Sequence, residues 1–175
     1  MAKTLPARFN PDLMVRDGTR YEVVLPIDRF PRLASILASA DGTVRATASF
    51  SRRKDHIVVA GRLAADWGLE CQRCLEPMSF PIDEPYELVF VDSEMAANDL
   101  PEEFDPVILD ENGQIHVVDL LEDELMLHVP PIPRHAEPAS CGEAAQHLVD
   151  PDELDEALDE KRPNPFDALK DLNIH

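Results

Sequence analysis

Two cysteines near the middle of the chain, Cys71 and Cys74, have a spacing that lets one tight turn direct both thiols at one centre. Such a C-x-x-C turn can bind a tetrahedral metal, form a small redox disulfide, or bury two small side chains with no further role. The redox alternative requires the first cysteine at a helix N-terminus. Here residues 65–70 have the pattern of a strand, and Pro77 interrupts any helix that follows. A redox role is therefore the weaker alternative, and spacing alone does not separate metal binding from a purely structural turn.

A metal site needs further ligands, and the chain offers a second pair, His135 and Cys141, with five residues between them. That spacing is within the usual range for the second ligand pair of a zinc site. Cys71, Cys74, His135 and Cys141 would form a closed Cys3His site of the structural kind, which makes structural zinc the one candidate cofactor. Residues 75–134 separate the two pairs, so they can meet only through tertiary folding.

Length and composition indicate one domain with some peripheral extension. The 175 residues are 44% hydrophobic, which is enough for a core, and only 6% aromatic, so aliphatic side chains must fill most of it. The first eight residues lack the apolar run of a signal peptide, and no stretch is long enough to span a bilayer. With three cysteines and no secretion signal, we expect a soluble cytoplasmic protein in a reducing compartment, without a membrane partner.

The net charge of −19 is confined to the second half of the chain. Residues 1–90 contain 12 basic and 12 acidic residues, so the remaining 4 basic and 23 acidic residues lie in residues 91–175. Such a field repels nucleic acid and attracts a basic partner. The alternative is a highly solvated surface that only keeps the protein soluble.

Hydrophobic periodicity in the first half predicts strands. From Thr43 to Phe50 apolar residues alternate with polar ones, as in a strand with one buried face. The other predicted elements are extended segments within residues 1–30, a helix from about Phe30 to Ala40, a charged loop at residues 51–55 and a strand at residues 56–64. The sequence thus predicts an α+β fold built on an antiparallel β-meander with a few short helices.

The cysteine motif is predicted at the tip of a hairpin in that meander. Residues 65–70 lead into the turn, and residues 78–92 leave it as a long strand. Pro81 and Pro85 interrupt this second strand, which indicates edge positions or a bulge.

The second half is predicted to be acidic and partly irregular. Residues 92–106 form an acidic loop, and Asn112-Gly113 indicates a tight turn. A helix from Asp119 to His128 places Leu120, Leu121, Leu125 and Leu127 on an apolar face and Glu122, Asp123 and Glu124 on a solvated one. Residues 134–149 are irregular, and two short helices follow Asp150-Pro151 and Asn164-Pro165. We therefore expect a domain at 1–149 and an acidic extension at 150–175.

The final predicted helix presents an apolar stripe of Phe166, Leu169 and Leu172. So short a helix is marginal alone, so the stripe must contact a partner or the protein's own domain.

With these segments identified, the sequence resembles the YceD family of bacterial and plastid proteins, named for large ribosomal RNA accumulation. The resemblance extends over most of the chain and rests on residues 70–77, 122–124, 129–135 and 163–169 together with Cys141. It implies a non-enzymatic role in the synthesis, processing or stability of 23S ribosomal RNA. In many bacteria the family's gene lies beside that of a small basic ribosomal protein of the large subunit, which implies a basic ribosomal protein as partner.

Three functional hypotheses remain. The first is a factor that acts on ribosomal RNA chiefly through basic protein partners. The second is direct binding of a ribosomal RNA precursor by the neutral first half, for which the candidate residues are Arg52, Arg53, Lys54 and Arg73, with Arg45 and Arg62. The third is a thiol enzyme built on Cys71 and Cys74. The chain has no phosphate-binding glycine loop, G-x-S-x-G elbow or H-E-x-x-H motif, so we expect neither an enzyme nor a small-molecule substrate.

Overall fold

The computed structural model describes residues 3–137 and 140–142. By their contacts, residues divide into two units, Met1–Arg134 and His135–His175. All helices and strands named below belong to the first unit. No helix among the described residues has the length and apolar composition needed to cross a membrane.

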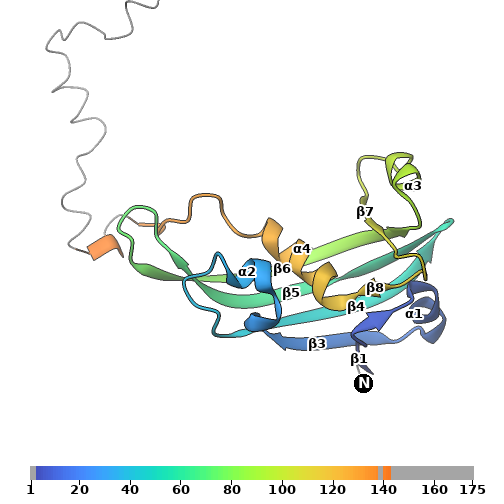
Figure 1. Cartoon of the computed structure of the whole chain (residues 1–175), viewed down its shortest axis with the longest axis horizontal. Helices are drawn as coiled ribbons and strands as arrows, with labels where there is room; N and C mark the ends of the chain where they lie inside the picture. The colour runs from blue at the N-terminus through green and yellow to red at the C-terminus, as the bar shows by residue number, and fades with distance from the viewer. Residues whose placement is uncertain (1–2, 138–139, 143–175) are drawn as a thin grey trace, which may run out of the picture. The chain divides into compact units, whose positions relative to one another are not determined.

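The first unit contains a six-stranded sheet and several short helices (Figure 1). In spatial order the strands are β1 (Lys3–Thr4), β3 (Arg20–Pro26), β4 (Thr43–Arg53), β5 (His56–Glu70), β6 (Pro77–Val91) and β7 (Asp105–Ile108). Strands β3 to β6 pair antiparallel in chain order, whereas β1 and β7 pair parallel to their neighbours at the two edges. A separate antiparallel pair joins β2 (Arg8–Phe9) to β8 (Ile115–His116). The α+β class is confirmed, with strands dominating and helices short.

Pro81 and Pro85, the two prolines inside β6, lie where that strand forms an edge. Pro81 is opposite Asp66 and Pro85 is opposite Arg62 in the pairing with β5. On its other side, β6 pairs with β7 only over residues 88–91. Proline cannot donate a ladder hydrogen bond, so this open stretch is the part of β6 that tolerates it. The predicted edge position is confirmed.

The extended structure predicted throughout residues 1–30 is wrong at α1 (Pro11–Asp17). Asn10 caps this helix by accepting a hydrogen bond from the Asp12 N–H at 2.9 Å, and Pro11 occupies its first turn. Gly18, at φ 62°, ends it. The Asn-Pro start is the same signal that predicts a helix at Asn164-Pro165.

The helix predicted from Phe30 to Ala40 is also shorter than expected. A 3-10 turn, η1 (Ile27–Arg29), precedes α2, which covers only Pro31–Ala34. Beyond it the Ala38 N–H donates to the Gly68 carbonyl at 2.9 Å, and Ser39 forms a β-bridge with Gly68. Pairing with β5 therefore replaces the later turns of the predicted helix.

Two predicted loops are partly regular. Residues 51–53 of the charged loop belong to β4, which leaves a two-residue turn, Lys54 and Asp55, before β5. The acidic loop at 92–106 contains α3 (Glu94–Asn98), whose N-cap Ser93 accepts from the Ala96 N–H at 3.3 Å, and its last residues begin β7.

The tight turn at Asn112-Gly113 is present. Gly113 adopts φ 67°, and its N–H donates to the Asp110 carbonyl at 2.8 Å. The strands on either side pair with β6 and β2 and not with each other.

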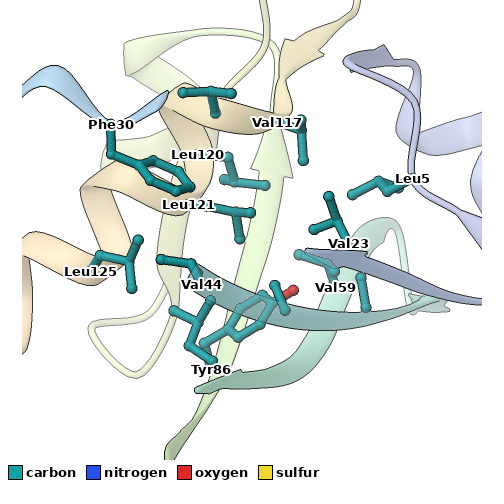
Figure 2. Packing of buried hydrophobic residues seen from close by; sticks show 14 of the residues in the cluster. Leu5, Val23, Phe30, Val44, Val59, Tyr86, Val117, Leu120, Leu121 and Leu125 are labelled. Carbon is teal, nitrogen blue, oxygen red and sulfur yellow. The ribbon is translucent and has the colours of Figure 1, made fainter. Parts of the chain in front are cut away.

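Helix α4 (Val117–Leu127) packs its apolar side chains against one face of the sheet and so forms the core. Figure 2 shows Leu120, Leu121 and Leu125 pointing toward the sheet residues Val44 and Val59, and all five are buried. The predicted apolar face is wrong at one position, because Leu127 is 77% exposed.

The predicted solvated face is wrong at Glu122, which is only 3% exposed. Its carboxylate accepts hydrogen bonds from the Arg32 N–H at 2.7 Å, the Leu33 N–H at 3.2 Å and the Arg32 Nε at 2.9 Å. These two backbone N–H groups lie in the first turn of α2, where a helix has no internal acceptors for them. Glu122 therefore caps α2 from another part of the chain.

Gly61 lies in β5, where groups from β4 and β6 approach its backbone too closely for a side chain. A Cβ atom at this position would lie 1.7 Å from the Thr47 carbonyl oxygen and 2.8 Å from a ring carbon of Tyr86. The Tyr86 hydroxyl donates to that same carbonyl at 2.9 Å. No residue with a side chain fits here without moving the backbone.

Candidate metal centre

The cysteine turn joins β5 to β6, as the sequence predicted. Glu70 and Pro77 are opposite each other at the ends of the two strands. Within the turn the Leu75 N–H donates to the Cys71 carbonyl at 2.8 Å, and the Cys71 N–H donates to the Glu76 carbonyl at 2.9 Å. Leu75 adopts φ 61°, a left-handed conformation that reverses the chain. The turn is therefore fixed by its own backbone before any ligand is considered.

The segment that follows α4 is attached to this turn. The Gln72 N–H donates to the Pro133 carbonyl at 2.8 Å. Pro133 precedes His135 by two residues, so the end of this segment is hydrogen-bonded to the turn that contains Cys71 and Cys74.

The predicted ligand set is the one cluster of metal-binding type found among the described residues. The ligand atoms of Cys71, Cys74, His135 and Cys141 all lie within 4.8 Å of one another. The Sγ of Cys141 lies 3.5 Å from Nδ1 of His135. Cys71 and Cys141 are fully buried, and Cys74 and His135 are partly buried.

This donor set fits zinc in both chemistry and size. Zinc bonds of about 2.3 Å to sulfur and 2.0 Å to nitrogen give ligand-to-ligand distances of roughly 3.5–3.8 Å in a tetrahedron. The 3.5 Å Cys141–His135 contact equals such an edge, and the 4.8 Å limit of the cluster lies about an ångström above it. Four protein ligands leave no open position for substrate or water, which is typical of a structural site.

The arrangement does not favour the thiol-enzyme hypothesis. In thioredoxin-like proteins the first cysteine begins a helix, whose dipole lowers its pKa. Here Cys71 follows the last residue of β5, and residues 72–74 form a turn.

The predicted RNA-binding residues fall at two distant places. Arg52 and Arg53 end β4 and Lys54 lies in the β4–β5 turn, whereas Arg73 lies in the cysteine turn, at the far end of the 15-residue β5. An extended strand of that length spans roughly 45–50 Å. The structure does not bring the four residues together.

Several arginines of the first half have an acidic neighbour. Arg53 donates to both carboxylate oxygens of Glu87, at 2.6 and 3.0 Å. This pairing raises the pKa of Arg53 and lowers the pKa of Glu87, chiefly through the side-chain hydrogen bonds. Of the other candidate arginines, Arg52 pairs with Asp12, Arg45 with Glu22 and Arg62 with Asp83. Lys54 is exposed at the turn.

Other predicted features lie outside the described residues. They are the apolar stripe of Phe166, Leu169 and Leu172 and the domain boundary between residues 149 and 150. The Gln72–Pro133 hydrogen bond, which connects the segment before His135 to the cysteine turn, was not predicted from the sequence. That bond joins two backbone groups, so no side-chain pattern could have signalled it.

A protein-family model described as "Large ribosomal RNA subunit accumulation protein YceD" matches residues 59–173, so the chain belongs to the YceD family. A protein of Haemophilus influenzae with the same description is 32% identical over 175 residues, which cover 96% of this chain and 95% of the relative. The resemblance inferred from the cysteine, Pro-Pro and C-terminal segments is thereby confirmed. No solved structure matches the chain.

Proposed function

We propose that this protein is a non-enzymatic cytoplasmic factor that supports the synthesis, processing or stability of 23S ribosomal RNA in large-subunit biogenesis. The observation that supports this most strongly is the match over nearly its whole length to a relative described as a large ribosomal RNA subunit accumulation protein.

We further propose that it acts chiefly through a basic ribosomal protein. Residues 92–105 contain six acidic residues and no basic one, and among the described residues none of the six forms an ion pair. Arg45, Arg52, Arg53 and Arg62 are each paired with an acid. An acidic segment without basic partners, beside arginines that are already paired, attracts a basic protein and repels the phosphates of RNA.

Zinc held by Cys71, Cys74, His135 and Cys141 would have a structural role in this function. When bound, it supplies one bond to each of these four side chains and so fixes the β5–β6 turn. The Gln72–Pro133 hydrogen bond already positions the neighbouring backbone. We propose that the resulting rigid end of the molecule presents the protein to its partner.

Direct RNA contact at the β4–β5 turn is the second candidate. Lys54 is exposed there, and it forms no ion pair in the described part of the chain. Exposed ion pairs such as Arg53–Glu87 are weak, so a phosphate could replace the carboxylate. This candidate predicts RNA binding that survives removal of protein partners.

Deletion of the gene tests the proposed function. We expect the ratio of mature 23S to 16S ribosomal RNA to fall, and the intact gene supplied from a plasmid to restore it. A Cys71→Ser/Cys74→Ser variant should restore it poorly. An unchanged ratio in the deletion strain would refute the proposal.

Affinity purification separates the two candidate modes. After nuclease treatment, we expect a basic large-subunit protein to remain bound to the wild-type chain. Loss of that protein on nuclease treatment, with RNA retained after stringent removal of protein, would favour direct RNA contact.

A further inference from the structure

An apolar groove of about 460 Å³ lies beside the β1 edge of the sheet, away from the cysteine turn. Its wall combines the chain just after β1, the second half of β3 and the first turn of α4. Figure 2 shows Leu5, Val23 and Val117 close together, one from each of these segments. The remaining apolar residues that line it are Ala7, Val24, Leu25 and Val118.

The groove runs along a strand edge that the described chain leaves open. β1 pairs with β3 only at Tyr21 and Glu22. After the Leu5 N–H, which donates to the Glu22 carbonyl at 3.4 Å, the chain leaves β3 and forms β2. No strand among the described residues pairs with residues 23–26 on this side.

The backbone of Val24 faces this open edge. In an antiparallel strand the N–H and carbonyl of one residue point to one side and those of the next residue to the other. The Glu22 carbonyl points to β1, whereas the Ile27 N–H donates to Gly42, on the β4 side, at 3.2 Å. The Val24 N–H and carbonyl therefore point away from β4, and the Val24 side chain is 46% exposed.

The charge of the groove favours an anionic group. Three charged residues line it, and two of them have partners, since Lys3 pairs with Asp17 at 2.8 Å and Glu22 with Arg45 at 2.6 Å. The third, Arg29, is exposed and forms no ion pair in the part of the chain that the structure describes. The groove thus offers one cation without a counter-charge.

We propose that this groove binds an extended peptide of a partner protein, which pairs with Val24 as an added strand and places a carboxylate against Arg29. An added strand uses the open backbone groups, and its alternate side chains enter the apolar groove, which is the established logic of strand addition. This proposal goes beyond the role in ribosomal RNA accumulation and does not depend on it.

A peptide fits these features better than RNA does. A phosphate could contact Arg29, but a nucleotide has no extended backbone with which to pair with the Val24 N–H and carbonyl. The lining beyond Arg29 consists mainly of Val, Leu and Ala side chains, with no aromatic ring on which a base could stack.

The experiment is a selection from a phage-displayed library of random decapeptides on the full-length protein. We expect enriched peptides in which apolar residues alternate and one acidic residue recurs at a fixed position. The best of them is then synthesised with a fluorescent label, and its affinity is measured by anisotropy. A copy with N-methylated backbone amides is the matched control, because it keeps every side chain but cannot pair as a strand.

Three variants of the protein locate the site. Val24→Pro removes the edge N–H and should weaken binding about tenfold, whereas Val24→Ala keeps the N–H and should weaken it less. Arg29→Gln should weaken binding of the acidic peptide two- to fivefold. It should not change the affinity for a version of that peptide in which glutamine replaces the acidic residue. Thermal melting checks that each variant is folded, and the N-methylated peptide keeps the test valid if Val24→Pro is not.

Several results would overturn the proposal. They are a selection without enrichment, a peptide that binds equally well after N-methylation, or equal affinity for wild type and a folded Val24→Pro variant. Single-stranded RNA that binds the wild type and loses affinity in Arg29→Gln but not in Val24→Pro would assign Arg29 to phosphate contact and also overturn it.

Discussion

The two hairpin turns at opposite ends of β5 form a natural comparison. At one end, the cysteine turn contains fully buried Cys71, is closed by two internal backbone hydrogen bonds and is attached to Pro133 by a third. At the other end, the Lys54–Asp55 turn is exposed, and the neighbouring Arg53 is paired with Glu87. Both turns contain residues that could bind a ligand, but only the cysteine turn is held by backbone hydrogen bonds around a buried side chain.

The difference shows that the burial and hydrogen bonding around a reactive or charged residue determine its role. The thiol of Cys71 is buried and cannot exchange partners freely with solvent, which suits a structural metal site. Exposed arginines exchange between a carboxylate, water and a ligand at little cost in free energy. We therefore expect substitutions at the cysteine turn to alter folding, and substitutions at the arginine turn to alter only interactions.

The largest effect is expected at the cysteine turn. Cys71→Ser should destabilise the protein by about 3 kcal/mol or more, because it removes one of the four proposed zinc ligands and buries a hydroxyl in place of the sulfur. Urea unfolding of wild type and variant gives the difference. As a control, a zinc chelator should destabilise the wild type and have little further effect on the variant. Equal stability of wild type and Cys71→Ser would contradict a structural role for the cysteine turn.

A second prediction tests whether burial, and not charge alone, separates strong from weak ion pairs. Glu122→Ala should cost about 2 kcal/mol, because the first turn of α2 loses its cap and the Arg32 and Leu33 N–H groups lose their acceptor. The matched control is Glu87→Ala at the exposed pair, which should change the urea midpoint much less. Similar losses for the two variants would contradict the distinction.

The same carboxylate predicts a pH dependence. Burial raises the pKa of Glu122, but hydrogen bonds from the Arg32 side chain and from the Leu33 and Arg32 backbone outweigh it, so the pKa lies below its ordinary value. The ionised group therefore stabilises the fold above the unfolded pKa of about 4.3, and this stabilisation is lost as the pH falls toward and below the lowered folded value. The stability gap between wild type and Glu122→Gln should narrow between pH 6 and pH 3. A constant gap would show that ionisation of Glu122 contributes nothing.

The smallest structural effect is expected at the arginine turn. Replacing Arg52, Arg53 and Lys54 together by glutamine should leave the melting temperature nearly unchanged. If this turn contacts RNA, the variant should bind RNA more weakly and with a flatter dependence on salt, because fewer counterions are released. Measuring affinity at several salt concentrations decides the point, and an unchanged slope would exclude the turn from RNA binding.

Sequence periodicity predicted the strands and α4 well, since one buried face imposes a regular pattern on each. The C-x-x-C hairpin followed from two such strands around a turn motif. The start of α1 has a recognisable signal in Asn10-Pro11, although the pattern of residues 1–30 predicts extended structure there.

Glu122 could not have been predicted. It belongs to the acidic run 122–124 of α4, and its partner Arg32 is 90 residues away in the chain. Long-range polar contacts of this kind depend on how elements pack, and local patterns contain no information about them. The same holds for the Arg53–Glu87 pair, which links two different strands.

The most direct test of the central claim is the zinc content of the full-length protein purified without chelator. If Cys71, Cys74, His135 and Cys141 close one structural site, elemental analysis should find about one zinc per wild-type chain and almost none in Cys71→Ser. Wild-type protein that contains no metal, and binds none when zinc is added to the reduced chain, would contradict the claim.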